Sequence, residues 1–328
     1  MILLLTNRTD IHPNLVIEKI SALGGKLFRL NTDDLLKANR VSCFPDEGKW
    51  RIKNIYTGRT ISSEEVGAVW ERRPSQPLTP RMISRNEYDD LIEKEAAEFV
   101  RWFRYSLQDV AWIGHPIYDR WAGSKMRQLQ LAHQLGARTP RTYLGNTLRD
   151  FLEWKQKGKS FAIKPLDADC LELGDEEYCF FSRRIESSEI AAIPKDVFEM
   201  TINYVQEYVE KLRELRVTVV GDHTFTCVID SQSMDEDKGR IDWRQGYDHD
   251  MKHYAIDTPV WVQKFCVEFL RLSNLVFGCF DFIETAEHEY IFLECNPNGQ
   301  WMWIEEKTGL KISDSIAQFL VDADYASS

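Results

Sequence analysis

Residues 278–304, GCFDFIETAEHEYIFLECNPNGQWMWI, form two apolar runs that are interrupted by Asp281, Glu294 and Asn296. Apolar runs of this length on either side of a short polar stretch predict a hairpin of two buried strands. With the turn centred on residues 287 and 288, antiparallel pairing sets Asp281 opposite Glu294. The chain must therefore fold so that two carboxylates meet within a sheet.

The polar side chains of this hairpin suit a metal ion. Period-2 alternation places Phe292, Glu294 and Asn296 on one face of the second strand. Two carboxylates and an amide oxygen are hard ligands that favour Mg²⁺, which usually completes its shell with water and substrate phosphates. The alternative is a half-exposed hairpin whose polar residues face water. Asp281 argues against it, because phenylalanine flanks it on both sides and an unpaired charge there is costly.

The stretch FLECNPNGQWMWIE resembles the metal-binding strand of ATP-grasp ligases. Its NPNGQWMW ending is similar to the ligases that crosslink graspetide precursor peptides of the microviridin and plesiocin type. The resemblance continues in the family's order through five further segments, namely SKMRQLQLAHQLG with Lys125, FAIKPL with Lys164, QEYVEK at 206–211, ELRVTVVGD at 214–222 and DWR at 242–244. No single segment is specific, so the argument depends on their order.

The resemblance implies an α/β (α+β) ATP-grasp fold. It places an N-terminal α/β pre-ATP-grasp domain in residues 1–118 and a central ATP-grasp subdomain in residues 119–205. A C-terminal subdomain in residues 206–328 then holds the metal site, and the last two units clasp ATP between them.

The resemblance also assigns roles to individual residues, with ATP and Mg²⁺ as cofactors. The metal ligands are Asp281, Glu294 and Asn296. By resemblance, the two lysines reach the phosphates of ATP, the backbone of residues 207–209 contacts adenine, and Glu214 accepts hydrogen bonds from the ribose hydroxyls. The full set of ATP-binding residues is Lys125, Lys164, Gln206, Glu207, Tyr208, Val209 and Glu214. Arg216 and Arg244 supply fork-shaped cations for the transferring phosphate. Without the resemblance, Lys164 is an edge-strand lysine in a salt bridge, and Glu207 and Glu214 are ordinary solvated charges.

The first part of the chain has a pattern of its own. A short apolar strand at 2–6, a helix at 13–23 and a strand at 27–31 predict a βαβ unit. A hairpin around Thr57 and Gly58 follows.

A further predicted strand, VWERRP, ends with Arg72 and Arg73. Their planar guanidinium groups suit a carboxylate, so we expect them to bind an acidic substrate; the alternative is a pair of ordinary surface arginines with acidic partners. The helix that follows, at about 86–109, presents apolar side chains inward, namely Leu91, Phe99, Trp102, Phe103 and Leu107.

Composition excludes several functions. The 328 residues carry a net charge of −11, which argues against a nucleic-acid partner. No apolar run approaches the length of a membrane span, and MILLLT is too short for a signal peptide, so we expect no membrane association. The seven cysteines lack metal-type spacing, and we interpret them as reduced core residues of a cytoplasmic protein.

The predicted function is that of an ADP-forming, ATP-dependent carboxylate ligase. By resemblance, the enzyme phosphorylates Asp or Glu side chains of a ribosomally made precursor peptide and then forms ester bonds to Thr or Ser, or amide bonds to Lys, which gives a macrocycle. The partner is a precursor with a leader and a core rich in Thr, Asp and Glu, and we expect the strand pair predicted within 170–184 to dock the leader. The resemblance also implies a homodimer.

Two alternatives stay open. The chain could be an ATP-grasp ligase that adds free amino acids to a peptide or small acid, or an inactive nucleotide-binding regulatory module. The NPNGQWMW ending favours the peptide crosslinker over the first, and the intact set of lysines, arginines and metal ligands argues against the second.

Overall fold

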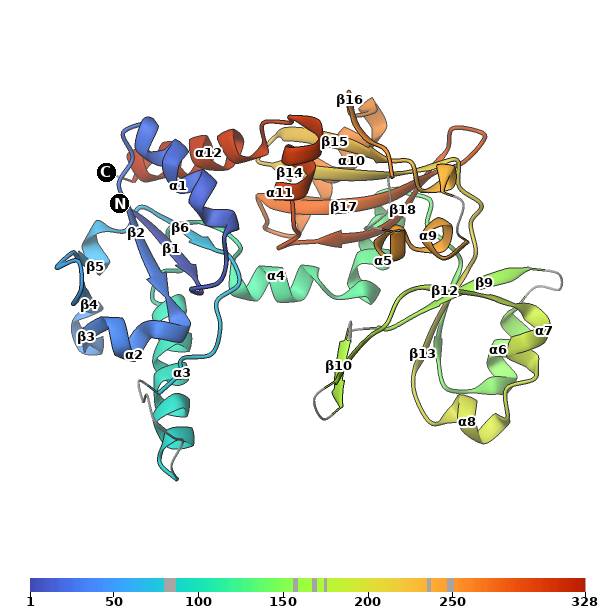
Figure 1. Ribbon diagram of the computed structural model, residues 1–328, viewed down its shortest axis with the longest axis horizontal. Helices are drawn as coiled ribbons and strands as arrows, with labels where there is room; N and C mark the ends of the chain where they lie inside the picture. Colours follow the sequence, from blue (N-terminus) through green and yellow to red (C-terminus); the bar gives the residue numbers. More distant parts are fainter. Residues whose placement is uncertain are drawn as a thin grey trace.

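The structure is a computed structural model that describes residues 1–79, 87–155, 159–166, 170–173, 176–234, 237–246 and 251–327. Figure 1 shows a parallel sheet at one end of the molecule and a long antiparallel sheet at the other, with a smaller antiparallel sheet below the long one. The architecture is mixed α/β, as predicted.

The N-terminal sheet has the strand order β2-β1-β6-β7 and is parallel throughout. Its elements are β1 (Ile2–Thr6), α1 (His12–Ala22), β2 (Leu27–Asn31), β6 (Ala68–Glu71) and β7 (Ala111–Ile113). The predicted βαβ unit is confirmed. Every residue of β1 is buried, because alternate side chains enter two different cores, as is typical of a parallel sheet covered on both faces.

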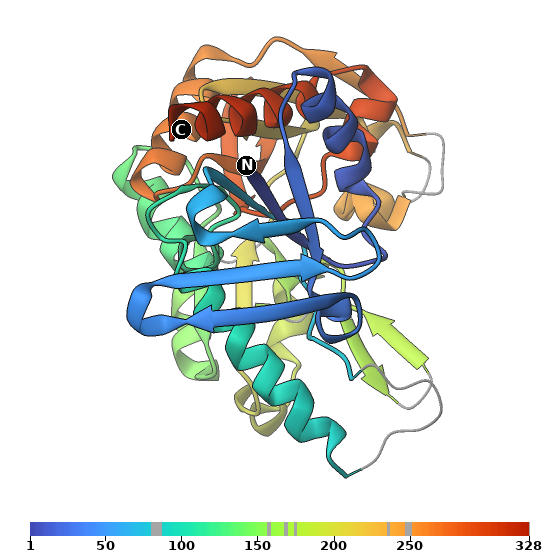
Figure 2. The same cartoon turned by 90° about the vertical axis from the view of Figure 1, so that its left-hand side faces the viewer.

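One face of this sheet packs against α1 and α12 (Ile312–Ala326). The other face is covered by a second sheet and by α3 (Asp89–Tyr105), which Figure 2 shows from the side. The second sheet consists of β3 (Asn39–Phe44), β4 (Lys49–Asn54) and β5 (Thr60–Ser62), and the predicted hairpin at Thr57 and Gly58 joins its last two strands. Leu91 was predicted to face inward from α3, but it is 57% exposed. It lies on the first turn of the helix, which projects beyond the sheet (Figure 1).

The central sheet has the order β12-β9-β13-β8. Its strands are β8 (Thr142–Gly145), β9 (Ser160–Lys164), β12 (Arg183–Glu186) and β13 (Asn203–Glu207). Helices α6 (Leu148–Trp154), α7 (Ser187–Ala191) and α8 (Lys195–Glu199) cover one face around Phe151 and Phe161. Lys164 lies in β9, between two partner strands, so its interpretation as an edge-strand lysine is wrong.

A hairpin of β10 (Cys170–Leu173) and β11 (Glu176–Cys179) extends from this sheet and confirms the predicted strand pair. Residues 174 and 175, between the two strands, lie outside the described residues. Cys179 is disulfide-bonded, and the strand register sets Cys170 directly opposite it. The prediction that all seven cysteines are reduced core residues is therefore wrong for Cys179, because spacing along the chain does not reveal which cysteines the fold brings together.

The C-terminal sheet is antiparallel with the order β16-β15-β14-β17-β18. Its strands are β14 (Arg213–Val220), β15 (His223–Ile229), β16 (His253–Ile256), β17 (Phe277–Glu284) and β18 (Tyr290–Asn296). One face packs on α5 (Lys125–Gln134) and α10 (Val260–Leu272), and part of the other on α11 (Met302–Thr308) and α12. Helix α4 (Pro116–Ala122) connects the N-terminal sheet to α5 (Figure 1).

The remaining elements are short: α2 (Leu35–Ala38), α9 (Asp237–Ile241) and the 3-10 helices η1 (Thr32–Asp34), η2 (Pro45–Glu47), η3 (Ser63–Glu65), η4 (Ser231–Ser233) and η5 (Trp243–Gly246). Among the described residues, no helix combines the length and apolar character needed to cross a membrane.

Candidate functional site

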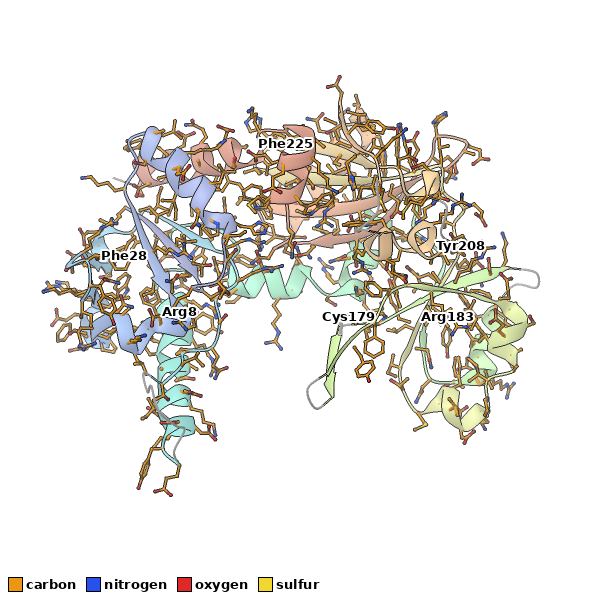
Figure 3. The ribbon with its side chains drawn as sticks, viewed as in Figure 1. Arg8, Phe28, Cys179, Arg183, Tyr208 and Phe225 are labelled. Atoms are coloured by element: carbon orange, nitrogen blue, oxygen red, sulfur yellow. The ribbon has the colours of Figure 1, made fainter. Side chains whose placement is uncertain are left out.

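A cleft of about 730 Å³ separates the central sheet from the C-terminal sheet. Figure 3 shows Tyr208 at the junction of the two sheets, with Cys179 and Arg183 toward the β10–β11 hairpin. The cleft brings together every residue predicted to bind phosphate, adenine, ribose or metal: Lys125, Lys164, Gln206, Glu207, Tyr208, Val209, Glu214, Arg216, Arg244, Asp281, Glu294 and Asn296. Arg73 also lines it, but Arg72 does not.

The two carboxylates face each other across β17 and β18, since Asp281 pairs with Glu294 as predicted. A β-bulge between this pair and the next shifts the register, so that Phe282 pairs with Phe292. Phe292 consequently lies in the apolar core while Glu294 lines the cleft. The prediction that Phe292 and Glu294 share one face of the strand is wrong, because the bulge inserts an extra residue between them and their side chains point to opposite faces.

The turn of this hairpin also differs slightly from the prediction. The N–H of His288 donates to the carbonyl of Thr285, and His288 has a positive φ of 60°. The register pairs Glu284 with Tyr290, so the loop is centred on Glu287, half a residue earlier than expected. The bulge compensates for that shift, which is why the Asp281–Glu294 pair is nevertheless formed.

Each carboxylate has a cationic partner. Arg216 donates to Asp281 over 2.6 Å, and Lys125 donates to Glu294 over 3.1 Å. Burial raises the pKa of Asp281 to about 6, because Arg216 offsets only part of the desolvation and the charge of Glu294 adds to it. Burial also acts on Glu294, but Lys125 and Lys164 outweigh it and lower the pKa of Glu294 to about 2. The charge of Glu294 acts on Asp281 because the strand register sets the two carboxylates opposite each other.

This donor set fits Mg²⁺. Among the described residues, no group of three or more His, Cys, Asp or Glu side chains could hold a metal, so a protein-only cage is absent there. Asp281, Glu294 and the amide of Asn296 all line the cleft, and two carboxylates with one neutral oxygen are what Mg²⁺ takes when phosphates and water complete its shell.

Two features of α5 place Lys125 beside Glu294. Lys125 is the first residue of the helix, and Gln128 lies one turn later. The Gln128 side chain accepts from the N–H of Cys295 over 2.9 Å and donates to its carbonyl over 2.6 Å. This buried glutamine attaches α5 to β18 next to Glu294. Sequence reasoning missed it, although a glutamine on the apolar face of a helix was a usable signal.

Lys164 projects from β9 into the cleft, with its Nζ 5.4 Å from the centre of the Tyr204 ring. Burial lowers the pKa of Lys164, and the charge of Glu294 offsets part of that effect. The ammonium of Lys164 thus lies in a poorly solvated position, where its attraction to a bound anion is stronger than it is in water.

The predicted adenine-binding segment follows β13. The N–H groups of Glu207 and Tyr208 donate to the carbonyls of Arg141 and Ser160, so neither can donate to a ligand. The N–H of Val209 has no hydrogen-bond partner among the described residues and lines the cleft. The Gln206 side chain is buried and donates to the hydroxyl of Thr142. Gln206 is therefore part of the wall of the cleft.

Glu214 and Arg216 share one face of β14, while Leu215, Val217 and Val219 enter the core behind it. Glu214 accepts from Lys211 over 2.7 Å and from the hydroxyl of Ser231 over 2.8 Å. It is therefore not a solvated charge. Lys211 lines the cleft as well, and its place was not predicted.

Arg244 is held by Asp242, which accepts from its Nε over 2.9 Å and its Nη2 over 2.7 Å. The hydrogen bond and charge of Asp242 raise the pKa of Arg244. Burial would raise the pKa of Asp242, but Arg244 outweighs it and lowers that pKa. Sequence reasoning assigned a role to Arg244 and none to Asp242, which orients it.

The two predicted substrate arginines point in different directions. Arg73 is exposed at the cleft and has a positive φ of 70°, which is uncommon for a residue other than glycine. Arg72 is only 2% exposed and donates to Asn298. It is therefore not an ordinary surface arginine.

Residues 1–120 match the family model described as the MvdD pre-ATP-grasp domain, while no curated protein matches the chain. A Chryseobacterium gregarium RiPP-associated ATP-grasp ligase, solved in complex with ADP and a leader and core peptide, is 26% identical with a TM-score of 0.87 over 98% of this chain and 96% of that one. The macrocyclase MdnC from Microcystis aeruginosa MRC, bound with precursor peptide MdnA, is 27% identical with a TM-score of 0.83 over 98% of this chain and 100% of that one.

The ATP-grasp ligase PsnB, complexed with minimal precursor, Mg and ADP, is 18% identical with a TM-score of 0.75, over 98% of this chain and 97% of that one. That likeness shows the fold alone. The chain therefore has the fold of ATP-grasp ligases, its residues 1–120 match the MvdD pre-ATP-grasp domain, and it is similar to the RiPP-associated ATP-grasp ligase and the macrocyclase over almost its whole length.

Proposed function

We propose that the protein is an ATP-dependent ligase that activates Asp or Glu carboxylates of a ribosomally made precursor peptide and crosslinks them within the same peptide. The observation that carries the proposal is the convergence, in one cleft, of two facing carboxylates with four cations, Lys125, Lys164, Arg216 and Arg244. Such a set matches a polyphosphate with its metal ion, and two similar proteins carry a precursor peptide in their structures.

The chemistry needs activation because a carboxylate is a poor electrophile. In the proposed reaction the substrate carboxylate attacks the γ-phosphorus of ATP, and the bond between that phosphorus and the β-phosphate oxygen breaks. ADP departs, and the substrate carboxylate has become an acylphosphate. A hydroxyl or amine of the peptide then attacks the acyl carbon and phosphate departs, which forms an ester or an amide. One proton leaves the nucleophile for each bond.

The residues of the chain contribute positioning and charge stabilisation to this reaction. Lys125 and Lys164 lie where they can hold phosphates, and Arg216 and Arg244 present planar donors, each fixed by an aspartate. Asp281, Glu294 and Asn296 would hold Mg²⁺, which when bound neutralises phosphate charge. The Val209 N–H and the neighbouring carbonyls offer adenine a donor and acceptors on adjacent backbone groups.

Arg73 is the proposed anchor for the acidic substrate. Its strained backbone precedes Pro74, and the Asn7 side chain donates to its carbonyl over 2.7 Å, which holds the strain in place. We expect Arg73→Gln to raise KM for the peptide about tenfold, since a charge-assisted hydrogen bond contributes roughly 1.5–3 kcal/mol, while KM for ATP stays unchanged. Initial rates at varied peptide and varied ATP measure both constants, and an unchanged peptide KM would remove Arg73 from the substrate site.

Mass spectrometry tests the reaction itself. With ATP, Mg²⁺ and a precursor, we expect ADP release together with loss of the mass of one water molecule per bond formed. Fragmentation then distinguishes ester from amide. A mass increase by amino-acid residues would instead support a ligase that adds free amino acids, and tight ATP binding without any mass change in the peptide would favour a regulatory module.

A separate surface for the leader is expected at residues 170–184, the β10–β11 hairpin and the start of β12. The side chains at 176 and 177 are not described, so Arg183, which is exposed, is the residue to change. We expect Arg183→Glu to raise KM for the full-length precursor and to leave turnover of a leaderless core peptide unchanged, because tethering raises the effective concentration of the core. Equal effects on both peptides would place the leader elsewhere.

A further inference from the structure

A tight turn carries Asn296 at the end of β18. The N–H of Gly299 donates to the carbonyl of Asn296 over 3.2 Å, and the N–H of Asn298 donates to the Asn296 side-chain oxygen over 3.1 Å. Pro297 in the second position and Gly299 in the fourth suit a type I turn, and an asparagine that bonds its own backbone two residues on is common in turns. The turn therefore orients the amide of Asn296.

The turn is closely packed on the side of the C-terminal sheet. A Cβ at Gly299 would lie 2.5 Å from the Cβ of Cys279 and 2.9 Å from the Nη2 of Arg216. Backbone of the turn therefore lies directly against β17 and the arginine that pairs with Asp281. Any displacement of the turn would move Asn296 relative to Asp281.

The turn is also held by Arg72, which comes from the N-terminal part of the chain. Its Nη1 donates to the carbonyl of Asn298 over 2.9 Å and to the side-chain oxygen of the same residue over 2.5 Å. The backbone of Arg72 is itself fixed, because its N–H donates to the carbonyl of Leu5 and continues the pairing of β6 with β1. These contacts connect a strand end of the first domain to the metal-binding edge of the cleft.

The burial of Arg72 would be costly if it served only to fill space. The side chain is 2% exposed, and its Nε and Nη2 atoms have no hydrogen-bond partner in the part of the chain that the structure describes. Burial lowers the pKa of Arg72 to about 10, although Asp10 offsets part of the effect, so the group is still charged at neutral pH. Because these atoms do not reach the cleft, Arg72 is not placed to contact a substrate there.

We infer that Arg72 is a positioning residue that acts through Asn298 to orient Asn296, and that it thereby couples the pre-ATP-grasp domain to metal binding. This inference rests on the proposed function in one respect, the assignment of Asn296 to the metal. It separates two adjacent arginines by role: Arg73 acts on the peptide and Arg72 on the metal-binding edge.

The test compares Arg72→Gln, Asn298→Ala and the double variant with Arg73→Gln as the matched control. Mn²⁺ serves as the probe, and its binding to the protein saturated with ADP is measured by calorimetry. We expect Arg72→Gln to weaken Mn²⁺ binding about 10- to 100-fold, the range for residues that orient a metal ligand. Asn298→Ala should weaken it less, because the hydrogen bond to the backbone carbonyl of residue 298 remains. The double variant should lose little more than Arg72→Gln alone, since Asn298→Ala removes one of the two hydrogen bonds that Arg72→Gln already removes. Arg73→Gln should leave the Mn²⁺ titration unchanged.

Turnover gives a second readout. The Mg²⁺ concentration for half-maximal rate should rise in the Arg72→Gln protein, and excess Mg²⁺ should restore part of kcat, which a general folding defect would not allow. KM for the peptide should change less than twofold. If Arg72→Gln fails to fold, Asn298→Ala tests the side-chain part of the contact without altering the first domain.

An unshifted Mn²⁺ titration in folded Arg72→Gln protein, or in Asn298→Ala protein where Arg72→Gln does not fold, would overturn the inference. That outcome differs from failure of the proposed function, in which the wild-type protein binds Mn²⁺ and ADP but modifies no peptide. In that case, weakened Mn²⁺ binding in the variants would still support the role of Arg72.

Discussion

Asp281→Asn and Glu294→Gln should each lower turnover by at least about 10²- to 10³-fold while the protein stays folded. A metal ion supplies several kcal/mol of charge stabilisation at a transferring phosphate, and about 1.4 kcal/mol corresponds to a factor of ten in rate. Each substitution removes one of two facing carboxylate charges with almost no change in volume. The measurement is the rate of ADP release at saturating ATP and peptide, together with Mn²⁺ binding to the ADP-bound protein.

The matched control for these variants is Glu287→Gln. Glu287 is exposed in the turn of the same hairpin and does not line the cleft, so its substitution should leave rate and metal binding unchanged. Asp281→Asn also releases Arg216 from its partner, which is why Glu294→Gln is the cleaner variant. Wild-type rates in Glu294→Gln at ordinary Mg²⁺ concentrations would refute the assignment of the metal site.

Lys164→Met should weaken ATP binding about 10- to 100-fold. A hydrogen bond to a charged group contributes roughly 1.5–3 kcal/mol, and methionine keeps the apolar stem of lysine beside Tyr204 without its charge. Burial already disfavours the ammonium, as the lowered pKa of Lys164 indicates, so we expect the melting temperature not to fall. Calorimetry with ATP in the absence of peptide measures the effect directly.

Lys195→Met is the control for that experiment. Lys195 belongs to the same central unit, but it is exposed and lies beside Glu199 on α8, away from the cleft. Its variant should bind ATP like the wild type. Equal ATP affinity in the Lys164→Met protein would mean that this lysine does not contact phosphate.

Local pattern predicted the pair of carboxylates in the cleft, and the resemblance to ATP-grasp ligases supplied the other residues, whose faces the regular strands explain. Alternation along β14 sends Leu215 and Val217 into the core and leaves Glu214 and Arg216 on the other face. Antiparallel geometry about a short turn brought Asp281 opposite Glu294. In both cases the period of the strand determines the face, and the period can be read from the order of apolar residues.

Irregular backbone and contacts between distant segments could not be predicted in this way. The bulge in β18 moves Phe292 into the core, and no local signal marks the extra residue. Leu91 has the spacing of a core residue, but the sheet that would cover it ends too soon.

By itself, the sequence determined the pairing of Asp281 with Glu294, since antiparallel pairing about a short turn is a local property, and its resemblance to ATP-grasp ligases pointed to the other predicted residues that line the cleft. Only the tertiary structure decided how those side chains are held. Gln128 attaches to Cys295 and Arg72 to Asn298, across separations of 167 and 226 residues. Such pairs depend on how α5 and the first domain pack against the C-terminal sheet, and packing of whole elements follows from the summed burial of many apolar side chains, which no single segment encodes.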